Sequence, residues 1–195
     1  MAGITVIDEC VCAFFERKRV FFAATFKCAE VFDKRSRDKE ILATLAKLYR
    51  DTEQEYSAIS VYNILATVVD NNDEIAKVQK TLAELNEEIH DYPAAFEAYK
   101  ACLEIYPTDV AINQNLISLY MKVGNNPKAI ESLLYLATSV NDSKDILWVY
   151  ENLVDLYVEI SEYEKAIEYS EKLLEIQENE ALTLKLARLT RELGK

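Results

Sequence analysis

The feature that most constrains the fold of this chain is a repeat with a period of 34 residues. Pro93 and Pro127 are 34 positions apart, and so are Ala95 and Ala129. Such periods are typical of arrays in which each repeat is one supersecondary unit that stacks on its neighbours. Extended along the 195 residues, the register defines five units and a remainder, namely 5–38, 39–75, 76–109, 110–146, 147–179 and then 180–195.

Within each unit the apolar residues follow two stripes with helical spacing. In the first half, the seventh, eighth and eleventh positions are mostly apolar, which marks one face of a helix. In the second half, the twentieth position is alanine in every unit: Ala24, Ala58, Ala95, Ala129 and Ala166. A small residue lets two helix backbones approach closely where they cross. Each unit is therefore predicted to be an antiparallel helical hairpin.

Turn-forming residues stand between the two predicted helices of a unit. Gly124 can adopt the left-handed conformation that ends a helix, Asn126 can cap the next helix, and Pro127 suits its first turn. The extra residues around 70–73 and 140–145 are rich in Asn and Asp and are predicted to lengthen two outer loops. With only three Gly and three Pro in the chain, a fold of many short strands is disfavoured.

The segment Asp91–Ala95, continued by Tyr99, Cys102 and Pro107, resembles the second helix of a tetratricopeptide repeat and its closing proline. The resemblance covers nearly the whole chain, although the family's early tryptophan and helix-packing glycine are absent. It implies an all-α fold, a right-handed α-α superhelix or solenoid of about five helix hairpins. Residues 1–195 would form a single domain, with 180–195 as a C-terminal capping helix.

Composition argues against several classes of function. The net charge of −12 repels nucleic acid phosphates, and the basic run Arg17–Arg19 is too short to be a footprint for them. The chain has one histidine, His90, and neither a phosphate-binding loop nor a nucleophile motif. Its four cysteines lack metal-binding spacing. We therefore predict no enzyme activity, no catalytic residue, no metal site and no cofactor.

The sequence favours a cytoplasmic protein or the soluble part of an anchored one. The longest uncharged stretch, 56–69, is too short to span a bilayer, and Asp8 and Glu9 stand where a signal peptide is apolar. Any membrane contact is expected to be indirect.

The resemblance also implies where a partner protein would bind. In the family, the first helices of the units line a concave groove that holds a peptide segment. The matching positions in this chain include Lys47, Lys77, Lys80, Thr81, Gln114, Asn115, Ser118, Trp148 and Asn152. The lysines would attract acidic side chains, the two asparagines would bind peptide backbone, and Trp148 would anchor an apolar side chain. The arrangement with which some members grip chaperone C-termini is not reproduced.

Simpler interpretations of these residues stay open at this stage. Asparagine is common on helix surfaces, and a tryptophan can merely fill a core. The predicted function is a protein-interaction scaffold or adaptor whose partner is another protein. One alternative is a secretion or assembly chaperone for one client. Another is the docking or regulatory fragment of a larger enzyme or membrane-anchored protein.

The first unit carries more aromatic residues than its two stripes can bury. Phe22 and Phe26 lie one helical turn apart, off the main stripe. An exposed apolar patch of this kind marks an interaction site, so we hypothesise that this end packs against something outside the isolated chain. The alternatives are a preceding segment, a second copy of the chain and a membrane-proximal partner.

For the homodimer form of this hypothesis, Phe22→Ser/Phe26→Ser should sediment as a monomer at concentrations where the parent self-associates. Analytical ultracentrifugation of both proteins measures this. Two equally soluble monomers would rule out self-association through these residues.

Overall fold

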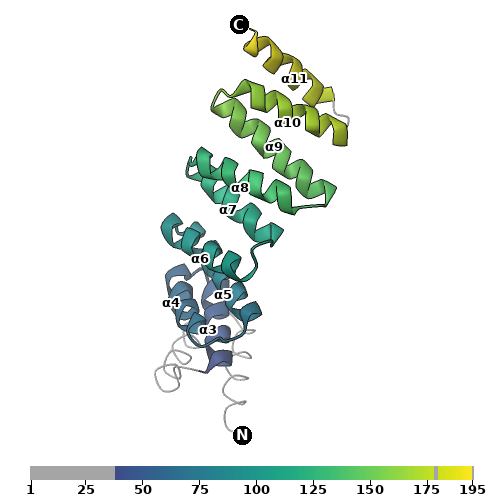
Figure 1. Cartoon of the computed structure of the whole chain (residues 1–195). Coiled ribbons are helices and arrows are strands. Elements are labelled where there is room, and N and C mark those ends of the chain that lie inside the picture. Colours follow the sequence, from purple (N-terminus) through teal and green to yellow (C-terminus); the bar gives the residue numbers. More distant parts are fainter. Residues whose placement is uncertain (1–37, 178–179, 195) are drawn as a thin grey trace. The chain divides into compact units, whose positions relative to one another are not determined.

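The structure, a computed structural model, describes residues 38–177 and 180–194. Every regular element in this part of the chain is an α-helix, which confirms the predicted all-α class (Figure 1). The first predicted unit apart from Asp38, and with it Phe22 and Phe26, lies outside the described residues. No described helix is both long enough and apolar enough to cross a membrane.

Contacts divide the chain into two compact units, Met1–Ile105 and Tyr106–Lys195. The described helices of the first are α3 (Lys39–Asp51), α4 (Glu55–Ala66), α5 (Asn72–Glu88) and α6 (Tyr92–Ile105). Those of the second are α7 (Val110–Lys122), α8 (Asn126–Ser139), α9 (Ser143–Glu159), α10 (Tyr163–Ile176) and α11 (Glu180–Leu193). Within each unit, every helix packs against the next one along the chain. The expectation of one continuous domain stays a prediction.

The two predicted stripes form the core of each hairpin. The alanines at the twentieth position of the described hairpins are all 0% exposed: Ala58, Ala95, Ala129 and Ala166. The leucines at the seventh position are buried as well: Leu45, Leu82, Leu116 and Leu153. The helical hairpin and its buried alanine are therefore confirmed in the four described hairpins.

The four turns within the hairpins share one geometry. Each contains a residue with positive φ: Glu53 (56°), His90 (62°), Gly124 (73°) and Ser161 (63°). The next residue donates its backbone N–H to the carbonyl five positions earlier, as in Asn125 to Tyr120 at 2.8 Å and Glu162 to Tyr157 at 2.8 Å. This pattern is the Schellman motif, which satisfies carbonyls at the end of a helix. The predicted left-handed conformation of Gly124 is confirmed.

Side chains cap two of the four helices that follow these turns, α6 and α8, whereas α4 and α10 have no side-chain cap. The prediction that Asn126 caps α8 was wrong, because Asn125 is the cap and accepts from the N–H of Lys128 at 3.4 Å. Gly124 directly precedes Asn125, so the residue that ends α7 and the residue that caps α8 are adjacent. Asp91 has the same role at α6, where it accepts from the N–H of Ala94 at 3.2 Å.

The prediction that extra residues lengthen two outer loops was also wrong in part. Helices α5 and α9 have 17 residues each, whereas α3 and α7 have 13. Asn71 and Asp142 cap the longer helices by accepting from Asp73 N at 2.9 Å and Lys144 N at 2.8 Å. Because asparagine and aspartate are strong N-caps, these polar segments begin helices early instead of extending loops.

Helix α11 packs against α10 and buries Leu189. Leu186 is half-buried, and Ala187, at the eighth position, is exposed although the stripe predicts a core residue there. In the other described units that position is buried, as in Ala46, Ala83, Ile117 and Val154. The exposed Thr183 and Thr190 on the same face suit a capping helix.

The turn geometry predicts a specific cost for Gly124→Ala. A Cβ at Gly124 meets no atom within 4 Å, so only the left-handed backbone penalises it. We expect the free energy of unfolding to fall by roughly 1 kcal/mol, the left-handed cost less the gain from a stiffer unfolded chain.

Gly194→Ala is the matched control, because its Cβ would make ordinary contacts at 3.6 Å and its φ is not positive. Urea unfolding of the parent and the two variants measures the difference. Equal stability of Gly124→Ala and the parent would contradict the turn assignment.

Candidate protein-interaction surface

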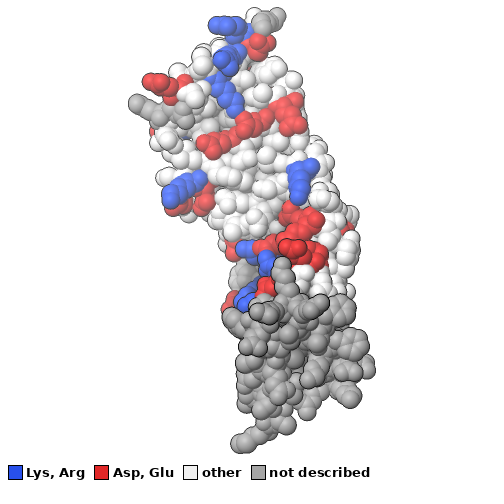
Figure 2. Space-filling view, turned by 180° about the vertical axis from the view of Figure 1, so that it is seen from behind, with Lys and Arg blue, Asp and Glu red and all other residues white. Residues whose placement is uncertain are grey.

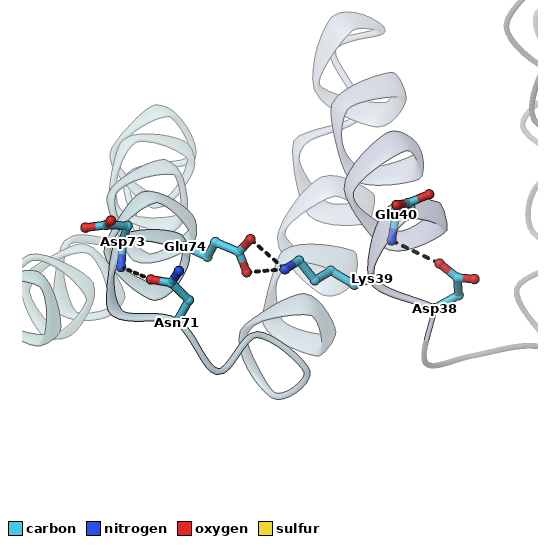
Figure 3. Close-up of polar contacts among 6 residues, drawn as sticks. All are labelled: Asp38, Lys39, Glu40, Asn71, Asp73 and Glu74. Atoms are coloured by element: carbon cyan, nitrogen blue, oxygen red, sulfur yellow. Dashed lines mark hydrogen bonds and ion pairs between the residues drawn. The ribbon is translucent and has the colours of Figure 1, made fainter.

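The predicted binding residues lie on the first helix of each hairpin, and the polar faces of these helices are here called the first-helix surface. In the N-terminal unit, two ion pairs join α3 to α5. Lys39 Nζ contacts both carboxylate oxygens of Glu74, at 2.5 Å from Oε1 (Figure 3). Arg50 Nη2 lies 3.3 Å from Glu84 Oε2. Since one pair lies near the start of α3 and the other near its end, the two helices run side by side.

The predicted lysines lie between these ion pairs. Lys47 precedes Arg50 by one helical turn, and Lys80 precedes Glu84 by one turn. Lys47 and Lys77 are exposed and Lys80 is half-buried. In the described part of the chain, none of the three forms an ion pair.

Polar contacts also join consecutive first helices in the C-terminal unit. Gln114 Nε2 on α7 donates to Asp145 Oδ1 on α9 at 3.4 Å. Lys185 on α11 forms an ion pair with Asp155 on α9. Gln114 is thus partly engaged within the unit. Asp145, Asp155 and Lys185 were not among the predicted site residues. The opposite charges of Asp155 and Lys185, 30 positions apart in the sequence, were a usable signal for their ion pair.

The sixth position of each unit distinguishes Asn115 from its equivalents. The side chains of Thr44, Thr81 and Asn152 donate to the carbonyl four residues earlier in their own helix, at 2.8, 3.0 and 2.7 Å. Among the described residues, the amide of Asn115 has no hydrogen-bond partner, and its side chain is half-buried. Asn115 and Asn152 occupy equivalent positions, yet only Asn115 keeps its whole amide available for another molecule.

Trp148 and Ser118 complete the predicted set in this unit. Trp148 is half-buried, so its ring is not wholly enclosed in the core, and Ser118 is exposed. The Trp148 carbonyl accepts the Asn152 amide. A half-buried tryptophan beside a polar helix face can offer an apolar contact to a bound segment.

Acidic residues form a ridge on α9 that the predicted site did not include. Glu151, Asp155 and Glu159 are four residues apart and all exposed, so they share one helix face. Figure 2 shows a band of acidic side chains beside basic ones in the C-terminal part of the molecule. The surface of this unit is therefore mixed in charge.

Buried tyrosines hold the second helices under this surface. Burial, and then a hydrogen bond from its hydroxyl to Glu87 Oε1 at 2.7 Å, raises the pKa of Tyr99. The Tyr169 ring of α10 lies 5.5 Å from that of Tyr150 and 5.7 Å from that of Tyr157, both on α9. Burial raises the pKa of Tyr157 and of Tyr169 above the ordinary tyrosine value.

Nothing in residues 38–177 and 180–194 groups three His, Cys, Asp or Glu side chains in a way that could hold a metal ion. Cys102 is buried and donates to the Ala76 carbonyl at 3.3 Å. His90 lies at a turn, exposed, with Nδ1 3.2 Å from the Tyr92 hydroxyl. These contacts give both residues structural roles.

Comparison with known proteins identifies the repeat by sequence and by fold. Residues 149–180 match a family described as tetratricopeptide repeat. A yeast protein, the RNA polymerase-associated protein CTR9 of Saccharomyces cerevisiae, is 28% identical over 130 residues, which are 67% of this chain but 11% of the relative. The chain thus spans only about a tenth of that relative's length.

Two solved structures show the fold. A chain of the Naa15/Naa10 complex bound to HypK-THB superimposes with a TM-score of 0.72 at 18% identity, covering 91% of this chain and 27% of the other. YrrB, described as a tetratricopeptide protein with an unusual peptide-binding site, gives 0.60 at 14% identity, covering 86% and 84%. The sequence match therefore identifies a tetratricopeptide repeat at residues 149–180. The solved structures show that the chain shares their fold, an array of helical hairpins.

Proposed function

We propose that this chain is a protein-interaction scaffold that binds an extended segment of a partner protein across α7 and α9. The tetratricopeptide fold favours the general role of binding another protein. The specific surface consists of Gln114, Asn115, Ser118, Trp148 and Asn152.

The observation that carries the proposal is the amide of Asn115, which makes no hydrogen bond within the described residues. A half-buried amide loses part of its hydration and makes no compensating hydrogen bond within the described protein. Its oxygen accepts and its nitrogen donates, which matches the alternating groups of a peptide backbone. A partner segment that supplies both groups would satisfy it.

Neighbouring side chains fit the same segment. Asn152 donates one amide N–H to its own helix. Its oxygen and its second N–H would bind the segment's backbone, with one donor fewer than Asn115. Trp148 would pack against one apolar side chain, and the exposed Ser118 would accept or donate at the edge. The described peptide-binding site of YrrB and the protein complex containing Naa15 support this class of function for the fold.

The test is a peptide array probed with the parent, Asn115→Ala and Asn63→Ala. Asn63 is exposed on α4, a second helix, so its substitution controls for the loss of an amide. We expect Asn115→Ala to bind the parent's peptides about tenfold more weakly, since one or two hydrogen bonds are lost, and Asn63→Ala to be unchanged.

Adding Asn152→Ala to Asn115→Ala should weaken binding further, but by a smaller factor. If both asparagine variants bind every peptide as the parent does, the asparagines have no role in recognition. Circular dichroism of each variant checks that helix content is retained.

The similarity to CTR9 favours a second candidate function, a docking module within a larger assembly. The match covers a short stretch of a long protein whose printed name places it with RNA polymerase. Affinity purification of the full reading frame from its native cell tests this. Stoichiometric RNA polymerase subunits in the eluate would support it, and their absence from a stable complex of other proteins would contradict it.

A further inference from the structure

The outward face of α4, the second helix of the first described hairpin, carries no charged side chain. Between residues 56 and 69 the exposed side chains are spaced by four, three and four positions, so they form one row along the helix: Tyr56, Ser60, Asn63 and Thr67. These residues are here called the α4 stripe. Tyr56 is its largest member and is 72% exposed.

The other described second helices carry charge at the positions that match the α4 stripe. In α6 the matching residues include Glu97, Lys100 and Glu104, and in α8 they include Glu131. In α10 every matching residue is a glutamate: Glu164, Glu168, Glu171 and Glu175. Because the chain has 34 acidic and 22 basic residues, an outward helix face without charge is an exception among these helices.

The absence of charge makes the α4 stripe suitable for pairing with itself. Two copies of this chain repel each other through their net charge of −12. In a two-fold symmetric interface the same patch lies on both partners, so a stripe of glutamates such as that of α10 would meet its own charge. The nearest charged residues in the sequence, Glu55 and Asp70, lie beyond the two ends of the α4 stripe.

The hydrogen-bonding groups of the α4 stripe are of two kinds. Ser60 and Thr67 donate their hydroxyls to carbonyls within α4, that of Tyr56 at 2.8 Å and that of Ile64 at 2.7 Å. Their oxygens can therefore only accept a hydrogen bond from another molecule. The amide of Asn63 and the hydroxyl of Tyr56 have no hydrogen-bond partner among the described residues, so both can donate.

We propose that two copies of this chain pair through the α4 stripe, with the two α4 helices antiparallel about a two-fold axis. The midpoint of the stripe lies between Ser60 and Asn63. The antiparallel arrangement therefore sets Asn63 opposite Ser60 of the second copy, and Tyr56 opposite Thr67. Each residue that can donate meets a hydroxyl that can only accept, and the half-buried Ile59 and Ile64 add apolar surface beside them.

This surface is separate from the scaffold function proposed above, because none of its residues belongs to the peptide-binding surface on α7 and α9. Helix α4 has 12 residues, which is about 18 Å of helix. Such a helix is short for a standard interface, so we expect a weak dimer with a Kd on the order of 10–100 μM. Each dimer presents two peptide-binding surfaces to a partner that carries two segments.

The test is sedimentation equilibrium of the whole chain from about 1 to about 500 μM, a range that spans the expected Kd. The parent should pass from monomer to dimer. Ser60→Glu/Asn63→Glu should stay monomeric, because it brings glutamates from both copies together without counter-charges. Ser60→Ala/Asn63→Ala, which adds no charge and favours helix, should weaken the dimer about tenfold through lost hydrogen bonds.

Leu134→Glu/Thr138→Glu is the matched control, because it adds the same charge at exposed positions of α8 that match Asn63 and Thr67. Its Kd should stay within about twofold of the parent value. Phe22→Ser/Phe26→Ser should also keep the dimer. Circular dichroism checks that every variant retains its helix content.

A parent that stays monomeric at every concentration would overturn the proposal, and so would a parent and a Ser60→Glu/Asn63→Glu variant that dimerise equally. Loss of the dimer in the α8 control would attribute self-association to overall charge, and its loss in the phenylalanine variant alone would attribute it to the first unit. Peptide binding is measured separately by fluorescence anisotropy in solution, where one peptide does not link two protomers. There, Ser60→Glu/Asn63→Glu and Asn63→Ala should bind as the parent does.

Discussion

The structure depends on an alanine that is completely buried on the second helix of each described hairpin. Ala58, Ala95, Ala129 and Ala166 have no exposed surface, and each packs in a hairpin whose first helix contributes a buried leucine. A larger side chain in such a position would separate the helices or force strain, typically at a cost of about 1–3 kcal/mol. The same small residue is buried at the same position of every described hairpin, although most of their other residues differ.

This packing determines where the chemistry of the protein can lie. The buried stripe occupies one face of each first helix, so its polar residues gather on the remaining surface. There, ion pairs and an amide contact join consecutive first helices, as between Arg50 and Glu84. Residues left out of these contacts, such as Asn115 and Lys77, are the ones available to a partner. We therefore assign partner binding to the polar first-helix residues that neither pack in the core nor join consecutive helices.

The sequence was sufficient for the repeat, the all-α class and the buried alanine, because these follow from periodicity and residue size. It failed where local capping decided the outcome: Asn125, not Asn126, caps α8, and polar residues such as Asn71 begin α5 early. The candidate site was only partly predictable. Periodicity placed Asn115 and Asn152 in equivalent positions, but it could not show that Asn152 bonds its own helix, since that depends on a side-chain rotamer.

The central claim, that the first helices of the C-terminal unit bind a partner segment, is tested most directly by nuclear magnetic resonance. An isotopically labelled chain is titrated with a peptide selected from the array, and amide chemical shifts are followed. The account predicts that the largest changes cluster around Asn115 and Trp148, on α7 and α9. Changes concentrated on α8 and α10, for example around the exposed Tyr135, would contradict it.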